Sequence, residues 1–399
     1  MKIVVDRKEL KNNLQILKKC VDSTNESCKL EVFDDKKSDN QLVLTTINNV
    51  IDISVKLTMI AIYYDEPFAC LVDVPDFYEI VRKFKSDEVH IDRVSDFMLN
   101  ISCGDMQEKI AYSIPNGKSS NYSLELDEKT EQLDDKKSFD IDSDKLIDLI
   151  KRTTYASQSK NTDSFWNTIS SNLYILKCIK FEIFKKYIKT VALDGYRLSM
   201  QLDHINGCVP EHFDMLILSD YLNTLSKALP KKYLIKVNVT KDGWVYFHWN
   251  SRMNIFKFQL CNDDYFKYQK IVPECDKFTT TIKVNRKQLL NAVKESKTYK
   301  KTYQCDHILD ILDIHDNKLR LTYRGNHKLL GTKDIDILQY GNDIEIAFNP
   351  KFLEEALKAN PKEFVKIKLI SELDPIIIMD CSRDNIGLIL PVRFRNCDY

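Results

Sequence analysis

Glycine is scarce in this sequence, and its scarcity removes several classes of nucleotide-binding protein. Only 9 of the 399 residues are glycine, and they form neither a GxGxxG turn nor a complete GxxxxGK[ST] phosphate loop. No apolar run approaches the roughly 18 residues that cross a bilayer. The opening MKIVVDRKEL turns polar after five residues, which argues against a secretory signal. We therefore expect a cytoplasmic protein with no membrane association.

Metal-binding and catalytic patterns are missing as well. The 11 cysteines include no CxxC pair, and the 7 histidines show no HxxxH or HxH spacing. Scattered thiols in a long chain are typical of small buried residues that stay reduced. We find no Ser-His-Asp order and no paired carboxylates. We expect no metal, no cofactor and no enzymatic activity.

The length and composition of the chain predict several globular domains. At roughly 100 to 200 residues per domain, 399 residues correspond to two to four domains, with three as the middle value. Hydrophobic residues make up 43% of the chain, which is enough for packed cores although 30% of the residues are charged.

Three segments share one pattern, which predicts an internal repeat. They are VVDRKELKNNL, DIDSDKLIDLI and KVNRKQLLNAV, which begin at Val4, Asp140 and Lys283. Each has a β-branched residue, then an Asp or Asn that can cap a helix, then a leucine four positions later and another apolar residue four beyond that. Each segment is therefore expected to be a strand that ends in a capped amphipathic helix.

A second pattern recurs downstream of each copy. LVDVPDFYEIVRKF, LILSDYLNTLSKAL and IAFNPKFLEEALKA each run from a short strand into a helix with an aromatic residue in its first turn, Phe77, Tyr221 or Phe352. Alternating runs such as QLVLTTI, WVYFHW and KLRLTY predict antiparallel strands between the helices. We expect linkers at 126–137 and 271–277, and hence an α+β chain of three like domains, 1–125, 136–262 and 276–399.

The formal net charge is zero, but the charge is unevenly distributed. The predicted helical segments 7–19, 76–85, 145–160, 220–232, 286–301 and 351–362 hold 24 of the 59 basic residues and 8 of the 59 acidic ones. An ordinary preference for lysine at helix C-termini explains part of this bias. The alternative is that the six helices turn a common basic face toward a polyanion such as duplex DNA, bound without sequence preference. The side chains expected to contact DNA are Lys11, Lys18, Lys19, Lys83, Lys151, Arg152, Lys160, Lys227, Lys294, Lys297 and Lys358.

The order of these motifs resembles the bacterial sliding clamp, the beta subunit of DNA polymerase III. TVALDGYRLSM (190–200) is similar to the signature of the family's second domain, IAFNPKFLEEALKA to a helix of its third, and LILPVRF (388–394) to its C-terminal strand. The resemblance covers essentially the whole chain. It implies three clamp domains, each with two helices on antiparallel sheets, and a homodimer that closes as a six-domain ring around double-stranded DNA. It also implies a DNA polymerase processivity factor that tethers the replicative polymerase, the clamp loader and other proteins with clamp-binding peptides.

The same resemblance implies a peptide-binding cleft between the second and third domains. The residues that it places there are Trp166 or Phe165, Leu193, Gly195, Tyr196, Arg197, Leu198, Phe266, Lys270, Ile271, Phe352, Pro375, Leu388, Leu390, Pro391 and Arg393. Leu193, Tyr196 and Phe266 stand where the family often has threonine, histidine and proline, so we expect a more apolar cleft with its own peptide preference. A tail, 395–399, extends past the family's usual end, and we expect it to border the cleft.

Other functions remain alternatives. A non-ring protein could bind DNA with the same basic helical face. Asp194, Tyr196 and Arg197 could form an acid–base cluster, although no second catalytic motif supports an enzyme. A sequence-specific DNA binder would need a helix whose Arg, Asn or Gln side chains read base edges, and none of the six helices repeats such a set.

Overall fold

The computed structural model describes residues 1–21, 26–33, 40–48, 53–114, 133–158, 171–249, 254–274, 276–302, 309–325, 328–379 and 385–393. The chain forms two compact units. Unit 1 comprises Met1–Ile147, Ile205–Glu211 and Asp220–Cys261, and unit 2 comprises Asp148–His204, His212–Ser219 and Asn262–Tyr399. The predicted second domain, 136–262, contributes to both units, and the division into three domains stays a prediction. Within the described ranges, no helix is long and apolar enough to cross a membrane.

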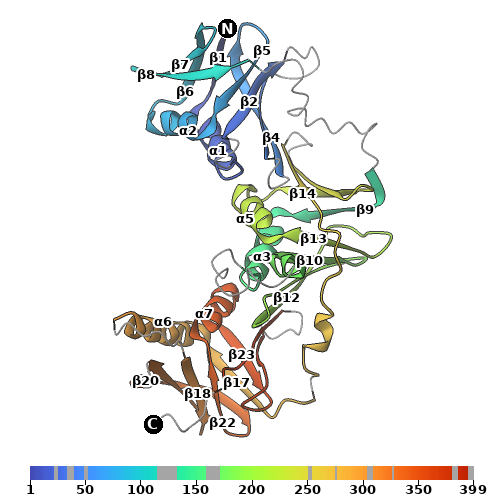
Figure 1. Ribbon diagram of the computed structural model, residues 1–399, viewed down its shortest axis with the longest axis vertical. Coiled ribbons are helices and arrows are strands. Elements are labelled where there is room, and N and C mark those ends of the chain that lie inside the picture. The colour runs from blue at the N-terminus through green and yellow to red at the C-terminus, as the bar shows by residue number, and fades with distance from the viewer. Residues whose placement is uncertain are drawn as a thin grey trace. The chain divides into compact units, whose positions relative to one another are not determined.

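Three pairs of α-helices occur in the described part of the chain, as the repeat predicts (Figure 1). The first member of each pair follows strand β1, β9 or β17, and the second follows β5, β13 or β22. The helices are α1 (Arg7–Leu17), α2 (Val74–Lys83), α3 (Ser143–Thr154), α5 (Ser219–Ala228), α6 (Arg286–Thr302) and α7 (Pro350–Ala359).

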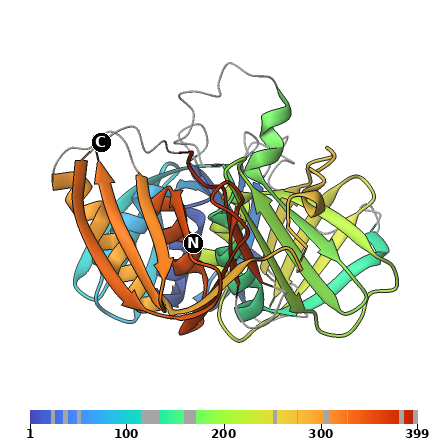
Figure 2. The same cartoon turned by 90° about the horizontal axis from the view of Figure 1, so that it is seen from below.

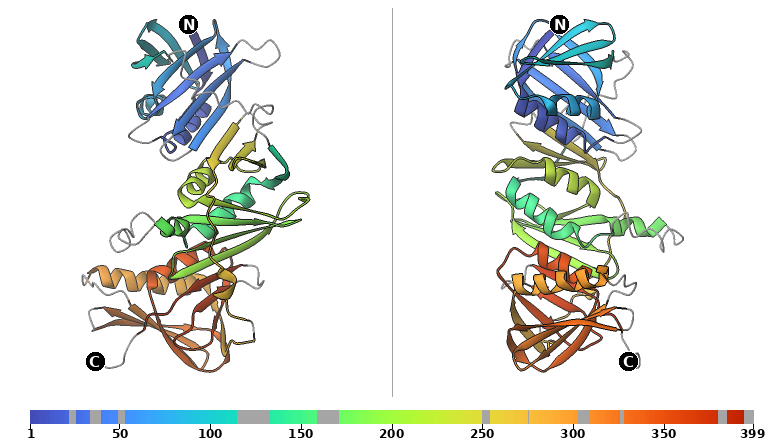
Figure 3. Two further views of the ribbon diagram at one scale, coloured as in Figure 1. Left: turned by 45° about the vertical axis from the view of Figure 1, so that its right-hand side comes forward. Right: turned by 90° about the vertical axis from the view of Figure 1, so that its left-hand side faces the viewer.

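Unit 1 is built on one twelve-stranded antiparallel sheet, in the order β1-β6-β7-β8-β5-β2-β3-β4-β16-β15-β14-β9. Helices α1 and α2 pack against each other beside it (Figure 3). The strands are β1 (Lys2–Asp6), β2 (Ser27–Phe33), β3 (Gln41–Asn48), β4 (Ile53–Tyr64), β5 (Phe68–Asp73), β6 (Glu88–Ser95), β7 (Met98–Cys103), β8 (Met106–Ser113), β9 (Leu133–Asp142), β14 (Leu234–Thr240), β15 (Trp244–Trp249) and β16 (Asn254–Gln259).

Unit 2 contains a nine-stranded and a four-stranded sheet. The first has the order β13-β10-β11-β12-β25-β24-β23-β17-β21, and the second, in orange in Figure 2, the order β20-β19-β18-β22. Helix α6 packs on β19 and β20 and against α7. The strands are β10 (Cys178–Ile183), β11 (Tyr187–Leu193), β12 (Arg197–His204), β13 (Phe213–Leu218), β17 (Thr280–Asn285), β18 (Leu309–His315), β19 (Lys318–Gly325), β20 (Lys328–Asp336), β21 (Leu338–Gly341), β22 (Ile344–Phe348), β23 (Phe364–Leu369), β24 (Ile376–Met379) and β25 (Ile386–Ile389). Two short 3₁₀ turns, η3 (Ser171–Lys177) and η4 (Tyr268–Lys270), complete the elements used below.

The four-residue spacing that predicted the repeat also separates the buried residues of the three first helices. The first leucine of each copy, Leu10, Leu146 or Leu289, is completely buried. The apolar residues four positions later, Leu14, Ile150 and Val293, are buried to the same degree. Positions four apart lie on one face of an α-helix, so each first helix covers its sheet with the same stripe.

Two of the three predicted first-helix caps form. The Asp6 carboxylate accepts a hydrogen bond from the backbone N–H of Glu9 at 2.8 Å, and Asn285 accepts one from Gln288 at 3.1 Å. In the second copy, Asp142 instead accepts a hydrogen bond from Nδ2 of Asn206 at 3.0 Å. Asn206 reaches it because its backbone forms a β-bridge with Asp140, two residues before.

The first predicted linker was partly wrong. Residues 126–132 lie outside the described residues, but Leu133–Lys137 form the start of β9. Among the described strands, β9 is an edge of the unit 1 sheet: it pairs along its length with β14, and its other side carries the bridge from Asp140 to Asn206. Such an edge can carry charged side chains in water, as exposed Lys136 does. The second predicted linker contains no helix or strand in its described residues, but it lies inside unit 2, so its role between domains stays a prediction.

Helix α5 ends earlier than the predicted 220–232. Its last residue is Ala228, and Pro230 follows, which has no backbone N–H to continue the helical hydrogen bonds. Lys232 then adopts a positive φ of 61°. Lys231 and Lys232 therefore lie beyond the helix rather than in its last turn.

Position 341 requires glycine for two reasons: its φ is positive, and a side chain there would clash with a neighbouring backbone atom. Gly341 has a φ of +98°, and an added Cβ would lie 2.0 Å from the carbonyl oxygen of Thr279. Gly195 of the same unit has a φ of +90° with open space around it. We expect Gly341→Ala to lower the free energy of unfolding by about 3 kcal/mol or more, and Gly195→Ala by about 1 to 2 kcal/mol from φ alone. Urea unfolding of both variants measures the difference, and equal losses would contradict the steric argument.

His248 on β15 makes the stability of unit 1 depend on pH. Burial and, secondarily, the positive charge of Lys236 lower the pKa of His248 to about 4. Because the unfolded chain binds this proton at about pH 6.5, the contribution of neutral His248 is complete above that pH and is lost as pH falls toward 4. We expect the wild type to lose about 2 to 3 kcal/mol across this window that His248→Phe does not lose. The urea midpoint at several pH values measures it, with His90→Gln of the same unit as control. An unchanged pH dependence in His248→Phe would refute the assignment.

Candidate partner-binding surface and helical cations

Strands β12 and β25 meet in unit 2 and bring two of the predicted segments together. Leu198 pairs with Leu388 and Arg197 with Ile389 in an antiparallel ladder. Beyond the ladder, the backbone N–H of Leu390 donates to the carbonyl oxygen of Tyr196 at 2.8 Å. TVALDGYRLSM and LILPVRF are therefore neighbours in one sheet.

Three of the predicted cleft residues lie beneath the surface. Leu193, Leu198 and Leu388 are buried in one hydrophobic cluster, which also contains Ile377 of β24 and Tyr268 of η4. In this structure these three side chains belong to the core of unit 2 rather than to its exposed surface.

Exposed Tyr196 and half-buried Phe352 form the aromatic part of this region. Tyr196 follows Gly195 in the turn between β11 and β12, and 48% of its surface is exposed. Its ring stacks on Phe352 with centroids 6.0 Å apart. The equivalent aromatics of the other copies, Phe77 and Tyr221, are buried. In the third copy this position is therefore half-buried, at the edge of the core rather than inside it.

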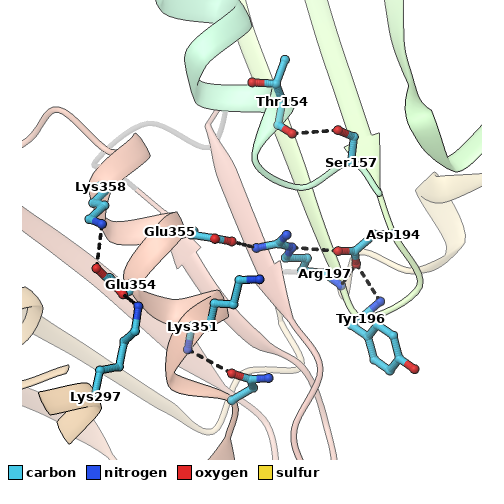
Figure 4. Close-up of polar contacts among 11 residues, drawn as sticks. Thr154, Ser157, Asp194, Tyr196, Arg197, Lys297, Lys351, Glu354, Glu355 and Lys358 are labelled. Carbon is cyan, nitrogen blue, oxygen red and sulfur yellow. Dashed lines mark hydrogen bonds and ion pairs between the residues drawn. The ribbon is translucent and has the colours of Figure 1, made fainter. Parts of the chain in front are cut away.

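Arg197 is held by two carboxylates and two aromatic rings. Its Nε donates to Asp194 at 2.8 Å, and its Nη1 pairs with Glu355 of α7 (Figure 4). The guanidinium lies 4.6 Å from the ring centroid of Phe352 and 5.7 Å from that of Tyr155. Only 8% of Arg197 is exposed. Its charge is therefore neutralised within the protein, and the side chain joins β12 to α7.

Asp194 also shapes the turn that carries Tyr196. Its Oδ1 accepts hydrogen bonds from the backbone N–H groups of Tyr196 and Arg197, both at 3.0 Å. Burial raises the pKa of the neighbouring Tyr155 phenol to about 12, so this ring stays neutral. The Asp194 hydrogen bonds therefore fix the turn.

The segment before β17 is anchored through Tyr268. Its hydroxyl donates to Oε2 of buried Glu182 at 2.7 Å. Burial tends to raise the pKa of Glu182, but hydrogen bonds from Lys189, Tyr268 and Lys180 outweigh it and lower the pKa. Phe266 is exposed and packs edge-on against Tyr265, which borders the buried cluster. The anchor thus fixes the segment that presents Phe266.

The remaining predicted cleft residues are less closely joined to this group. Lys270, Ile271 and Arg393 are exposed, and Pro375 and Pro391 are half-buried. Among the described residues, no side-chain hydrogen bond, ion pair or ring contact joins them to Tyr196 or Phe352. Phe165, Trp166 and the tail 395–399 lie outside those residues.

The predicted DNA-contacting cations differ in whether an acidic side chain of the protein already pairs with them. Lys11, Lys19, Lys151, Lys227 and Lys294 form no ion pair within the described ranges. Lys83 is exposed and lies 3.9 Å from Glu108. Lys18 pairs with Glu79 at 3.0 Å, and Lys297 and Lys358 share Glu354 at 2.5 and 2.6 Å (Figure 4). Lys160 lies outside the described residues.

Arg152 differs from the other cations. Its side chain is 11% exposed and pairs with Asp148 at 3.1 Å. It also lines a small cavity of about 10 Å³ with Tyr155 and Gly387, about the space of one water molecule. Its position suits packing beside β12 better than contact with a polyanion.

Sequence reasoning missed Glu355, Tyr155 and Tyr268. Glu355 follows Glu354 in α7, and nothing in the sequence shows which of the two meets Arg197 and which meets lysine. Tyr268 gave a weak signal, as one of three aromatics in DDYFKY (263–268). Tyr155 follows directly after α3.

Comparison with known proteins agrees with this geometry. Residues 269–393 match the family described as DNA polymerase III beta subunit, C-terminal domain. The beta sliding clamp of Bacillus subtilis is 21% identical over 339 residues, which cover 82% of this chain and 81% of that protein. The beta sliding clamp of Streptococcus pneumoniae is 26% identical over 249 residues, 61% of this chain and 64% of that one.

Solved structures share the fold over nearly the whole chain. The DNA polymerase III beta subunit of Thermotoga maritima superposes with a TM-score of 0.81 at 18% identity, covering 99% of this chain and all of that one. The Bacillus subtilis DNA polymerase sliding clamp also gives 0.81, at 19% identity and the same coverage. The fold is that of the DNA sliding clamps. Together with the matched C-terminal segment, this fold makes the chain similar to the DNA polymerase III beta subunits.

The Arg197 contacts predict an asymmetric pair of mutational effects. Arg197→Ala leaves the Asp194 and Glu355 carboxylates without their cation, and we expect it to lower the free energy of unfolding by about 3 to 5 kcal/mol. Glu355→Ala keeps the Arg197–Asp194 pair and should cost about 1 to 2 kcal/mol. Thermal and urea unfolding compare the two, with exposed Lys351→Ala of the same helix as control. Equal losses for the two variants would show that Arg197 does not join the carboxylates as described.

Proposed function

We propose that the chain is a DNA polymerase processivity factor that acts as a ring-shaped sliding clamp. Two chains would close head-to-tail into a six-domain ring around double-stranded DNA, in the cytoplasm. The observation that carries the proposal is the clamp fold with its three pairs of helices, which together hold 17 basic and 9 acidic residues in the described part of the chain. The role is non-catalytic: a topologically linked ring keeps its polymerase at high effective concentration on DNA.

The unpaired helix lysines suit a ring that slides. Lys19, Lys151, Lys227 and Lys294 are exposed and have no acidic partner in the described part of the chain. An ammonium on a flexible stem attracts phosphate without the fixed geometry of an arginine fork. Contacts of this kind are independent of sequence and weaken as salt rises. This favours sliding over stopping at one site.

The surface formed by Tyr196, Phe352, Leu390 and Phe266 is our proposed docking place for partner peptides. These four side chains are exposed or partly exposed, while the cluster beneath them and the Arg197 contacts keep their supports in place. Aromatic anchors of this kind provide much of the binding energy at protein interfaces. We propose that the replicative polymerase, the clamp loader and other clamp-binding proteins use it, and that Arg197 acts as a support for the surface rather than as a free donor.

Retention on circular DNA tests the ring directly. We expect the chain, loaded on a nicked circular plasmid by its clamp loader, to stay bound through gel filtration at moderate salt. Cutting the plasmid once should release it, because a ring slides off free ends. The bound fraction before and after linearisation is the measurement, with end-blocked linear DNA as the matched control.

A surface binder would behave differently in this experiment. Equal retention on circular, cut and end-blocked DNA would favour the non-ring DNA-binding protein and reject the clamp. Loss from cut DNA but not from end-blocked DNA supports encirclement.

A further inference from the structure

Unit 1 contains a polar cavity whose lining includes two of the exposed lysines proposed to face DNA, Lys19 and Lys227. It has a volume of about 460 Å³ and lies between α1, the segment from the end of α5 to Tyr233, and strands β4, β15 and β16. That volume is within the range of small-molecule sites. Unlike most such sites, it is lined largely by charged and amide side chains, which favour a polar ligand.

Two cations line this cavity without acidic partners. Lys19 follows α1 and Lys227 lies in the last turn of α5, and both are exposed. Neither forms an ion pair within the described ranges. By contrast, the adjacent Lys18 pairs with Glu79 and does not line the cavity. Two uncompensated ammonium groups from separate helices point to a ligand with phosphate charge.

Amide side chains provide the neutral hydrogen-bonding groups. Asn12 and Gln15 lie one turn apart on α1, and neither side chain forms a hydrogen bond within the described part of the protein. Asn254 of β16 accepts a hydrogen bond at Oδ1 from the backbone N–H of Thr58 at 2.8 Å, which leaves its two amide donors for a ligand. Carboxamides offer donor and acceptor together, the pattern that base edges match.

An aromatic ring and one carboxyl complete the lining. Tyr233 is 45% exposed, whereas Trp249 is buried against Phe256 with centroids 5.8 Å apart. Tyr233 is therefore the accessible aromatic residue of the lining, and Trp249 is a buried part of the wall. Glu9 is the one acidic lining residue among those described, and burial, together with the nearby Asp6, raises its pKa. The lining as a whole carries more positive than negative charge.

We propose that this cavity binds a single nucleotide unit, with phosphate at Lys19 and Lys227, the base edge at Asn12, Gln15 and Asn254, and the base ring against Tyr233. The nucleotide comes either from solution, as a nucleoside monophosphate, or from DNA, as an unpaired nucleotide. The inference goes beyond the proposed function, because encirclement needs only sequence-independent phosphate contacts.

Calorimetric titration of the full chain with the four deoxynucleoside monophosphates tests the proposal, with inorganic phosphate as reference. We expect at least one monophosphate to bind more tightly than phosphate alone. Lys19→Ala with Lys227→Ala should weaken that binding by about tenfold or more, and Tyr233→Ala should remove the preference over phosphate. Lys18→Ala is the matched control and should change it by less than about twofold.

A second titration separates the two sources. A duplex with one bulged nucleotide is compared with its fully paired counterpart. If the nucleotide comes from DNA, the bulged duplex binds more tightly and loses this advantage in the Lys19/Lys227 double variant. If the ligand is free, the monophosphates bind and the bulge has no effect.

Two results would overturn the proposal. One is a wild type that binds neither a monophosphate nor the bulge preferentially. The other is a Lys18→Ala variant as weak as the double variant, which would indicate general electrostatics. Retention of the wild type on circular DNA is measured separately, so failure of the cavity and failure of the clamp role are distinguishable.

Discussion

The antiparallel pairing of β12 with β25 is the interaction on which the candidate partner-binding surface depends. It joins two segments that are far apart in the chain and sets their register. With this register, Leu198 and Leu388 are buried while Tyr196 and Leu390 lie at the exposed end of the ladder. Side chains alternate between the faces of a sheet, so a shift of one residue would move Leu198 and Leu388 to the opposite face and out of the hydrophobic cluster that they share. The surface and the core beneath it are therefore specified together.

The repeated helices could be predicted from the sequence because their signal is local. An Asp or Asn, a leucine four residues later and a second apolar residue after four more mark each first helix, and all three appear where expected. Helix ends were harder to predict, since Pro230 outweighs the lysines that suggested a longer α5. The strand at Leu133–Lys137 was missed because an edge strand can be as polar as a linker.

The candidate site could be predicted only in part. The motifs identified Gly195 to Leu198 and Leu390, but not how Arg197 is used. Its partner Glu355 is distant in sequence and adjacent to another glutamate, so the choice between them depends on tertiary packing. The partial exposure of Phe352 could not be predicted either, because the repeat equates it with two buried aromatics. Where one copy differs from the others in burial, as at Phe352, the difference depends on the neighbouring residues in the tertiary structure, here Tyr196.

Charge counting on the helices overstates what a polyanion would meet. Lys300 of α6 is buried, with Nζ 2.6 Å from Oδ1 of Asp310, and serves the interior of unit 2. Glu354, bound by Lys297 and Lys358, acts as a built-in counter-ion for those two ammonium groups. A cation already neutralised by its own protein holds fewer ions from solution and exchanges fewer of them with a phosphate. The third copy should thus contribute less to the ionic-strength dependence of DNA affinity than its number of lysines suggests.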